Sequence, residues 1–149
     1  MRKIIFIILI VNIQFSFSQN SESQQKDYKY QYNDFISFKI KKMKEHKKGG
    51  AGYVPLRGFT SFKFYLTFKN FSDSEQTADL DSIFLANPLT KKRYKLKWFN
   101  TSGIGSKIKT TFKLKPNKKK TFIVFYIFEN KQKPYFLIKD RLLNINHND

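Results

Sequence analysis

Basic side chains recur at every second position in two stretches of the chain, which is the spacing that puts strand residues on one face. The six residues are Arg93, Lys95, Lys97, Lys107, Lys109 and Lys113. If the two strands are neighbours, these side chains form a broad cationic face. Such a face attracts polyanions and binds them by releasing their counterions. The chemistry expected here is electrostatic binding of lipopolysaccharide, acidic polysaccharide or extracellular DNA.

The same pattern has a second interpretation, in which the lysines only solvate an outer surface and keep edge strands from pairing with other chains. The chain has 29 Lys and Arg residues against 11 Asp and Glu, a formal net charge of +18. Only four of the basic residues are arginine, and lysine lacks the planar fork that grips a phosphate with two hydrogen bonds. Both interpretations stay open on the sequence alone.

Aromatic residues stand close to the basic ones along the chain. Alternation predicts that Tyr65 points outward between Lys63 and Lys69, and Phe99 follows Lys97 at a strand end. Exposed rings beside basic groups can hold single-stranded nucleic acid by base stacking. Ordinary packing within a sheet is the alternative, and an export signal argues against a nucleic-acid role inside the cell.

Residues for catalysis or metal binding are scarce. Cysteine is absent, which excludes disulfides, thiolate chemistry and anchoring through a lipidated cysteine, and the two histidines are His46 and His147. The chain has no Gly-x-Ser-x-Gly, His-Glu-x-x-His or phosphate-loop motif. An acidic cluster that matches no calcium-binding loop comprises Asp73, Glu75, Asp79 and Asp81. We expect a protein that is not an enzyme and has no cofactor or metal; an envelope hydrolase with an unrecognised acid pair is the alternative.

Residues 1–18 have the features of an export signal. Two basic residues precede the apolar run Ile4–Val11, which is much shorter than the roughly 20 residues that span a membrane. Ser16 and Ser18 supply the small residues of a cleavage site, so we expect cleavage between Ser18 and Gln19, with an uncleaved anchor as the alternative. Removal of this segment lowers the net charge from +18 to +16, because it contains two basic residues and no acid. The mature protein is expected in the periplasm or outside the cell.

Period-two alternation of apolar residues predicts an all-β domain over residues 34–149, after a flexible polar lead over residues 19–33. Seven or eight short antiparallel strands with turn residues between them are typical of a β-sandwich, with a five-stranded barrel as the alternative. The strands are expected at 35–43, 61–69, 80–86, 93–98, 107–114, 122–128, 135–138 and 142–145. The third and fourth are expected to pair as a hairpin.

Three stretches, Phe62–Ser72, Leu80–Tyr94 and Leu114–Phe128, carry a resemblance to a known family. In the first stretch, a strand ends in Lys-Asn. In the second, a strand is followed by a short turn and a lysine-rich return. In the third, Leu-Lys-Pro leads through a turn into an apolar strand. The chain resembles the small secreted bacterial immunoglobulin-like domains of unknown function, similar in kind to a mycobacterial secreted immunoprotective antigen. The resemblance implies an immunoglobulin-like antiparallel β-sandwich, and it transfers no catalytic residue.

The sequence therefore predicts a secreted or periplasmic, non-catalytic binding module. We expect a monomer without a transmembrane segment in its mature form. Its partner would be an unknown envelope or extracellular protein, met through a sheet edge or loop face, or a polyanion met through the lysines.

The export signal gives a direct test. The intact mass of the protein purified from its native host should correspond to a chain that begins at Gln19. A mass that retains residues 1–18 would contradict the predicted cleavage.

Overall fold

The computed structural model describes residues 27–46, 55–101 and 109–145. The export signal, its cleavage site and Lys107 lie outside these residues. The described segments form eleven strands and one 3₁₀ turn, η1 (Leu80–Ser82). The strands are β1 (Tyr30–Gln31), β2 (Ile36–His46), β3 (Phe59–Asn70), β4 (Gln76–Asp79), β5 (Ile83–Ala86), β6 (Arg93–Tyr94), β7 (Trp98–Thr101), β8 (Thr111–Leu114), β9 (Lys119–Glu129), β10 (Tyr135–Ile138) and β11 (Arg141–Asn144).

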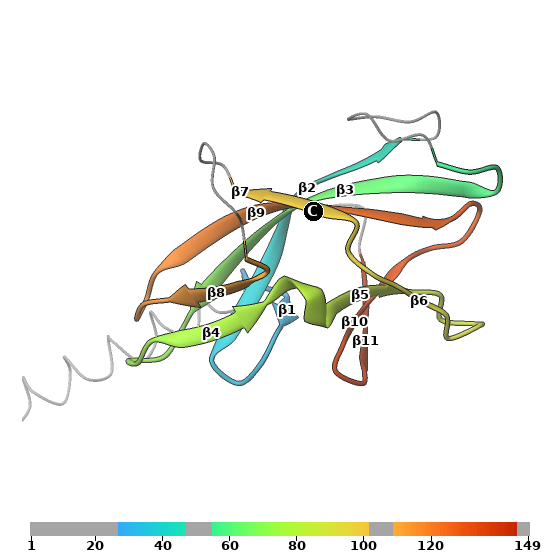
Figure 1. Ribbon diagram of the computed structural model, residues 1–149. Helices are drawn as coiled ribbons and strands as arrows, with labels where there is room; N and C mark the ends of the chain where they lie inside the picture. Colours follow the sequence, from blue (N-terminus) through green and yellow to red (C-terminus); the bar gives the residue numbers. More distant parts are fainter. Residues whose placement is uncertain (1–26, 47–54, 102–108, 146–149) are drawn as a thin grey trace, which may run out of the picture.

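The strands form an antiparallel β-sandwich. A five-stranded sheet has the order β1-β2-β3-β9-β7, and a four-stranded sheet has the order β11-β10-β5-β6. β4 and β8 form a separate two-stranded ribbon. Figure 1 shows the five-stranded sheet as the upper layer, the four-stranded sheet below it, and the ribbon at one side. The predicted all-β fold with antiparallel strands is therefore confirmed.

Alternation along β3 and β9 builds the core between the layers. The two strands pair along their length, from Phe59 opposite Glu129 to Lys69 opposite Lys119. Phe64 of β3 is fully buried, and its ring centroid lies 5.2 Å from that of Phe136 on β10. Each fully buried phenylalanine of this kind stabilises the fold by roughly 1.5–3 kcal/mol. Because inward and outward residues alternate, the same register fixes which side chains of β3 and β9 face away from the four-stranded sheet.

A buried hydroxyl links the two layers. Tyr126 of β9 is fully buried, and its hydroxyl donates a hydrogen bond of 2.9 Å to the carbonyl oxygen of Ile83 on β5. Burial raises the pKa of the Tyr126 hydroxyl, so it remains protonated and keeps donating. The hydrogen bond satisfies a polar group that would otherwise cost free energy in the apolar core.

The prediction of a single strand over residues 93–98 is wrong. β6 covers only Arg93 and Tyr94 and pairs with β5, as the expected hairpin requires, whereas β7 begins at Trp98 and pairs with β9 in the other sheet. The intervening residues carry the chain from one layer to the other. Leu96 packs against the core during this crossing, which explains why an apolar alternation occurs without a strand.

The structure also contains strands that the sequence did not predict. β4 reads Gln-Thr-Ala-Asp, and only Ala78 among these residues is buried, so apolar alternation is too weak to reveal it. The structure has Leu80–Ser82 as η1, which shortens the strand expected over 80–86. Tyr30 and Gln31, assigned to a flexible lead, form β1 and pair with β2, and Tyr30 is buried.

The link between Tyr126 and Ile83 predicts a measurable loss of stability. Tyr126→Phe should lower the free energy of unfolding by about 1 kcal/mol, the usual net value of one buried hydrogen bond, in urea denaturation. Tyr135→Phe, at a half-buried position of β10, is the control and should change stability by less than about 0.5 kcal/mol. Equal losses in the two variants would contradict the role of the hydroxyl.

Candidate anion-binding surface

The structure does not bring the five described members of the predicted polyanion-binding set, Arg93, Lys95, Lys97, Lys109 and Lys113, together on neighbouring strands. Arg93 lies in β6 of the four-stranded sheet, and Lys113 lies in β8 of the separate ribbon. Lys95 and Lys97 lie in the connection between two layers, and Lys109 precedes β8. The expectation that each run occupies one face of one strand is therefore wrong, because strand pairing breaks both runs.

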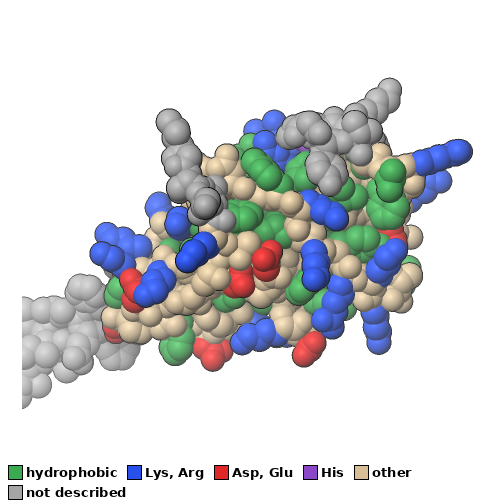
Figure 2. Space-filling view, viewed as in Figure 1, with side chains coloured by type: hydrophobic (Ala, Val, Ile, Leu, Met, Phe, Trp, Pro, Cys, Tyr) green, Lys and Arg blue, Asp and Glu red, His purple; other side chains and the backbone are tan. Residues whose placement is uncertain are grey.

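Two of these residues are also engaged in ion pairs. Arg93 Nη2 lies 3.6 Å from Asp140 Oδ1, and Lys113 Nζ lies 3.1 Å from Glu75 Oε1. All four side chains are largely exposed, so each pair adds little stability. The carboxylates nevertheless reduce the positive potential at these positions. Figure 2 shows the result, since basic side chains spread over the face in view and acidic side chains lie among them.

A different set of lysines shares one surface. The inward residues of β3 are buried aromatic and aliphatic side chains, so its odd-numbered residues face away from the four-stranded sheet. The pairing of β3 with β2 and β9 places further lysines beside them on that outer side. We call this surface the outer lysine face, and its members are Lys39, Lys42, Lys44, Lys63, Lys69 and Lys119.

A β-bulge creates part of the outer lysine face. Ile40 pairs with Leu66, but the next pair joins Lys42 to Tyr65, which leaves Lys41 as the extra residue of β2. An extra residue reverses the orientation of the side chains that follow it. The bulge therefore directs Lys42 and, two residues later, Lys44 to the same side as Tyr65.

Like charges stand directly opposite each other on this surface. Lys44 pairs with Lys63 across β2 and β3, and Lys69 pairs with Lys119 across β3 and β9. Lysines directly opposed across strands repel each other and destabilise a sheet by roughly 0.2–1 kcal/mol per pair. Bound anions would remove this repulsion. The opposed lysines therefore lower the stability of the free protein and favour anion binding.

Carboxylates on these strands gather at one end. The acidic residues of β2, β3 and β9 are Glu45, opposite Phe62, and Glu129, opposite Phe59. Both line a hollow of about 430 Å³ whose wall includes Lys131 and Lys133. The Lys44 and Lys63 end of the outer lysine face therefore lies nearest these carboxylates, and the Lys69 and Lys119 end lies farthest from them.

The two aromatic residues singled out in the sequence behave differently. Tyr65 is half-buried on the outer side, and the ammonium of Lys63 lies 5.6 Å from its ring centroid, so its predicted outward position is confirmed. Phe99, expected beside Lys97 at a strand end, packs against the core. Trp98 is 47% exposed and pairs with Phe125 of β9, so it supplies the exposed ring at that edge of the sheet.

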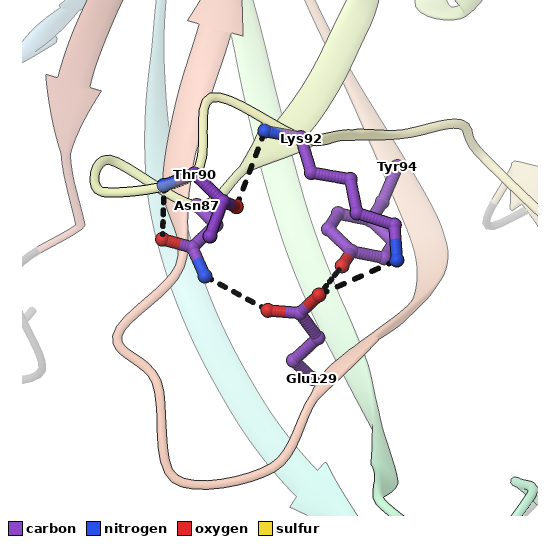
Figure 3. Close-up of polar contacts among 5 residues, drawn as sticks. All are labelled: Asn87, Thr90, Lys92, Tyr94 and Glu129. Atoms are coloured by element: carbon purple, nitrogen blue, oxygen red, sulfur yellow. Dashed lines mark hydrogen bonds and ion pairs between the residues drawn. The ribbon is translucent and has the colours of Figure 1, made fainter.

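Glu129 joins the two layers through a polar network (Figure 3). Its carboxylate accepts hydrogen bonds from the hydroxyl of Tyr94 and, at 2.8 Å, from Nδ2 of Asn87. Lys92 Nζ lies 3.5 Å from the same carboxylate. Asn87 Oδ1 in turn accepts hydrogen bonds from the backbone N–H groups of Leu89 and Thr90. The network therefore fixes the β5–β6 hairpin to the end of β9.

The network also sets the charge of Glu129. Hydrogen bonds from Tyr94 and then Asn87 favour the carboxylate and lower the pKa of Glu129, with Lys92 adding to the shift. Desolvation, and then the hydrogen bond to Glu129, raise the pKa of the Tyr94 hydroxyl well above its ordinary value of 10.0. A catalytic acid at neutral pH needs the opposite shift of a carboxyl group. Glu129 is thus suited to hold two sheets together.

The acidic cluster of the sequence is distributed among turns and strands. Asp79 Oδ1 accepts a hydrogen bond of 3.0 Å from the backbone N–H of Asp81 and so caps η1. Glu75 pairs with Lys113. Within residues 27–46, 55–101 and 109–145, no three His, Cys, Asp or Glu side chains are arranged to hold a metal ion. The described part of the chain likewise has no helix long and apolar enough to cross a membrane.

Comparison with known proteins finds similarity in fold. No protein-family model and no curated protein matches the chain. Among solved structures, the chain is similar to the YcdA protein of Bacillus subtilis, described as a candidate lipoprotein, with a TM-score of 0.57 and 11% identity. The match covers 81% of this chain and 39% of the Bacillus protein, so the chain spans about two-fifths of that protein. A β-sandwich protein of Clostridium difficile matches with a TM-score of 0.42 and 10% identity, over 76% of this chain and 87% of that one.

The Glu129 network predicts a pH-dependent stability. The folded-state pKa of Glu129 is below its ordinary value of 4.5, so its contribution is complete above about pH 4.5 and is lost as the pH falls through the folded-state pKa. Glu129→Gln should lower the Tm at neutral pH, and the difference from the wild type should shrink as the pH falls below about 4.5. Thermal unfolding across this range measures it.

Glu75→Gln is a suitable control, because the ion pair of Glu75 is exposed and is not part of the network. Its effect on the Tm at neutral pH should be smaller. A Glu129→Gln effect that stays constant from neutral pH to about pH 3 would contradict the linkage.

Proposed function

We propose that this protein is a non-catalytic binding module that acts outside the cytoplasm and binds polyanions on the outer lysine face. The observation that carries the proposal is the register of β2, β3 and β9, which directs six lysines to the same side of one sheet. The carboxylates of these strands, Glu45 and Glu129, lie at the end of the sheet nearest Lys44 and Lys63. A surface of this kind concentrates negatively charged polymers at a distance and then binds them through counterion release.

The dimensions of the sheet suit an extended ligand. Neighbouring strands lie about 4.8 Å apart, and outward residues on one strand lie about 6.8 Å apart. The lysines from Lys44 to Lys69 therefore form a two-dimensional array that a flexible chain of phosphates, sulfates or carboxylates can follow. Tyr65 and Trp98 add aromatic surface to the same side of the sheet. Because lysine ammonium groups act as point charges, we expect selection by charge density more than by sequence.

The outer lysine face differs from the set of six polyanion-binding residues predicted from the sequence. Arg93 and Lys113 face carboxylates, and strand pairing separates them. The members of the outer lysine face come from three adjacent strands of a single sheet. Binding by this set uses rigid strand positions, which hold charges more accurately than a connection between layers does.

The proposal includes the type of β-sandwich and the location of the protein. We take the sandwich to be of the immunoglobulin-like kind, exported to the periplasm or the medium after cleavage between Ser18 and Gln19. The export signal and the fold shared with a Bacillus candidate lipoprotein support a place in the envelope or the medium. An envelope or extracellular protein is the alternative partner. The lysines of β2 beyond its short pairing with β1, and the bulge in its pairing with β3, argue against strand pairing with such a protein.

A salt series with double-stranded DNA, heparin and lipopolysaccharide tests the proposal. If about six anionic groups are engaged, affinity for DNA should fall roughly 10³-fold between 50 and 200 mM salt. The double variant Lys44→Glu, Lys63→Glu should weaken binding of all three polymers and reduce the logarithmic salt slope by about two.

The matched control is Lys95→Glu, Lys109→Glu, which changes the net charge by the same amount at two exposed positions off the five-stranded sheet. This variant should retain the wild-type slope. An equal loss of affinity in both variants would show that binding depends on net charge alone and would contradict the outer lysine face as the site. An affinity of the wild type that does not change with salt would contradict polyanion binding.

A further inference from the structure

A hollow of about 530 Å³ opens at the end of the five-stranded sheet where Lys69 lies opposite Lys119. Its lining residues are Asp27, Tyr28, Lys39, Lys69, Asn117, Lys118 and Lys119. Four of these seven side chains are lysines, and three of the four belong to the outer lysine face. The volume falls within the roughly 300–1,000 Å³ of small-molecule sites, and it exceeds what one inorganic oxyanion needs.

A buried asparagine fixes the frame of this hollow. Asn70, at the end of β3, is fully buried, and its Nδ2 donates hydrogen bonds to the carbonyl oxygens of Ser74 and Leu114 at 2.7 and 3.0 Å. Its backbone N–H donates to the carbonyl oxygen of Lys118 at 3.1 Å. The side-chain oxygen accepts from Ser72. These bonds hold the lysine-bearing turn before β9 against the end of β3.

The turn from Lys115 to Lys118 has a defined backbone conformation. Asn117 has a φ of +56°, a left-handed conformation that asparagine tolerates better than most residues. Lys118 N–H donates to the carbonyl oxygen of Lys115 at 3.1 Å and closes the turn. Lys118 and Lys119 therefore follow a fixed turn.

Aromatic rings position the remaining ammonium groups. Lys39 Nζ lies 5.0 Å from the ring centroid of Tyr28, and Lys69 Nζ lies 4.7 Å from that of Phe71. The two rings meet edge to face, with centroids 5.4 Å apart. Cation–π contacts at exposed sites contribute about 0.5–1 kcal/mol each. They favour defined positions for the two ammonium groups over free movement in solvent.

The remaining polar groups suit hydroxyl partners. Desolvation, and then the nearby Asp27 carboxylate, raise the pKa of the Tyr28 hydroxyl, so it stays protonated and can donate. Asp27 can accept hydrogen bonds, and the Asn117 amide can donate or accept them. A ligand with an oxyanion at one end and hydroxyl groups at the other would use both parts of the lining.

The opposite end of the sheet provides a contrast. The hollow of about 430 Å³ contains Glu45 and Glu129 together with Lys131 and Lys133. Its carboxylates offset its lysines and disfavour an anion. The two ends of one sheet therefore differ in charge although their volumes are similar.

We propose that the hollow bounded by Tyr28, Lys39, Lys69 and Lys119 binds a sugar that carries a phosphate or sulfate monoester, as the end group or branch of a longer polyanion. This inference rests on the proposed function and names the unit that the surface recognises. The oxyanion lies between the ammonium groups and relieves the repulsion between Lys69 and Lys119. The sugar hydroxyls face Asp27 and Asn117.

Calorimetric titration with glucose 6-phosphate, glucose 6-sulfate and glucose tests the inference. At least one of the two esters should bind, and unmodified glucose should not. The double variant Lys39→Gln, Lys119→Gln should weaken ester binding by about tenfold or more, since two charge-assisted contacts are lost. Its matched control is Lys131→Gln, Lys133→Gln in the other hollow, which should bind the esters as the wild type does. Thermal unfolding of both variants reports whether they fold.

The outcomes separate this inference from the function on which it rests. Wild-type protein that binds DNA with a steep salt slope but no ester at millimolar concentration would overturn the inference alone. Ester binding that is weakened equally in the two variants, or matched by inorganic phosphate, would overturn it as well. Binding of one ester and not the other identifies the source of the oxyanion and supports the site. If the Lys39→Gln, Lys119→Gln variant does not fold, Tyr28→Phe provides the second test. This variant should bind the esters more weakly and should keep the wild-type affinity for DNA.

Discussion

The pairing of β3 with β9 is the constraint on which the other features depend. Eleven residues of each strand are in register, and alternation then assigns each side chain to the inner or the outer side of the sheet. One side of the pair supplies buried rings such as Phe64 and Tyr126, which contact the four-stranded sheet. The other side supplies Lys63, Lys69 and Lys119. A shift of the register by one residue would bury these lysines and expose the rings, so the register that builds the core also places these three lysines on the outer side of the sheet.

The sequence predicted the parts of the fold in which local pattern and tertiary environment agree. Strong apolar alternation identified β2 and β3, and the unbroken apolar run from Phe122 to Phe128 identified β9 as a central strand, which it is, between β3 and β7. It also predicted the outward position of Tyr65. Polar segments such as β1 and β4 were missed because their stability comes from pairing with distant strands, which local periodicity does not record.

The candidate surface was mislocated for a related reason. Spacing shows which residues share a face only while they remain in one strand, and the chain changes layers between Tyr94 and Trp98. The β-bulge between Ile40 and Lys42 is a second feature that a single sequence does not reveal, although it determines which lysines of β2 face outward. The excess of lysine on the chain did indicate a basic surface, and Lys39, Lys63 and Lys69 stood in predicted strands. Their assembly required the register of three strands, of which β9 is far from β2 and β3 in sequence.

Lysine footprinting locates the surface that binds the polyanion. Acetylation of the protein with and without DNA, read by mass spectrometry, reports the solvent access of each ammonium group. We expect protection of Lys42, Lys44 and Lys119, which are exposed in the free protein, and little protection of Lys95, Lys109 and Lys113. Protection centred on the second group, or spread evenly over both groups, would contradict the assignment of binding to the outer face of the five-stranded sheet.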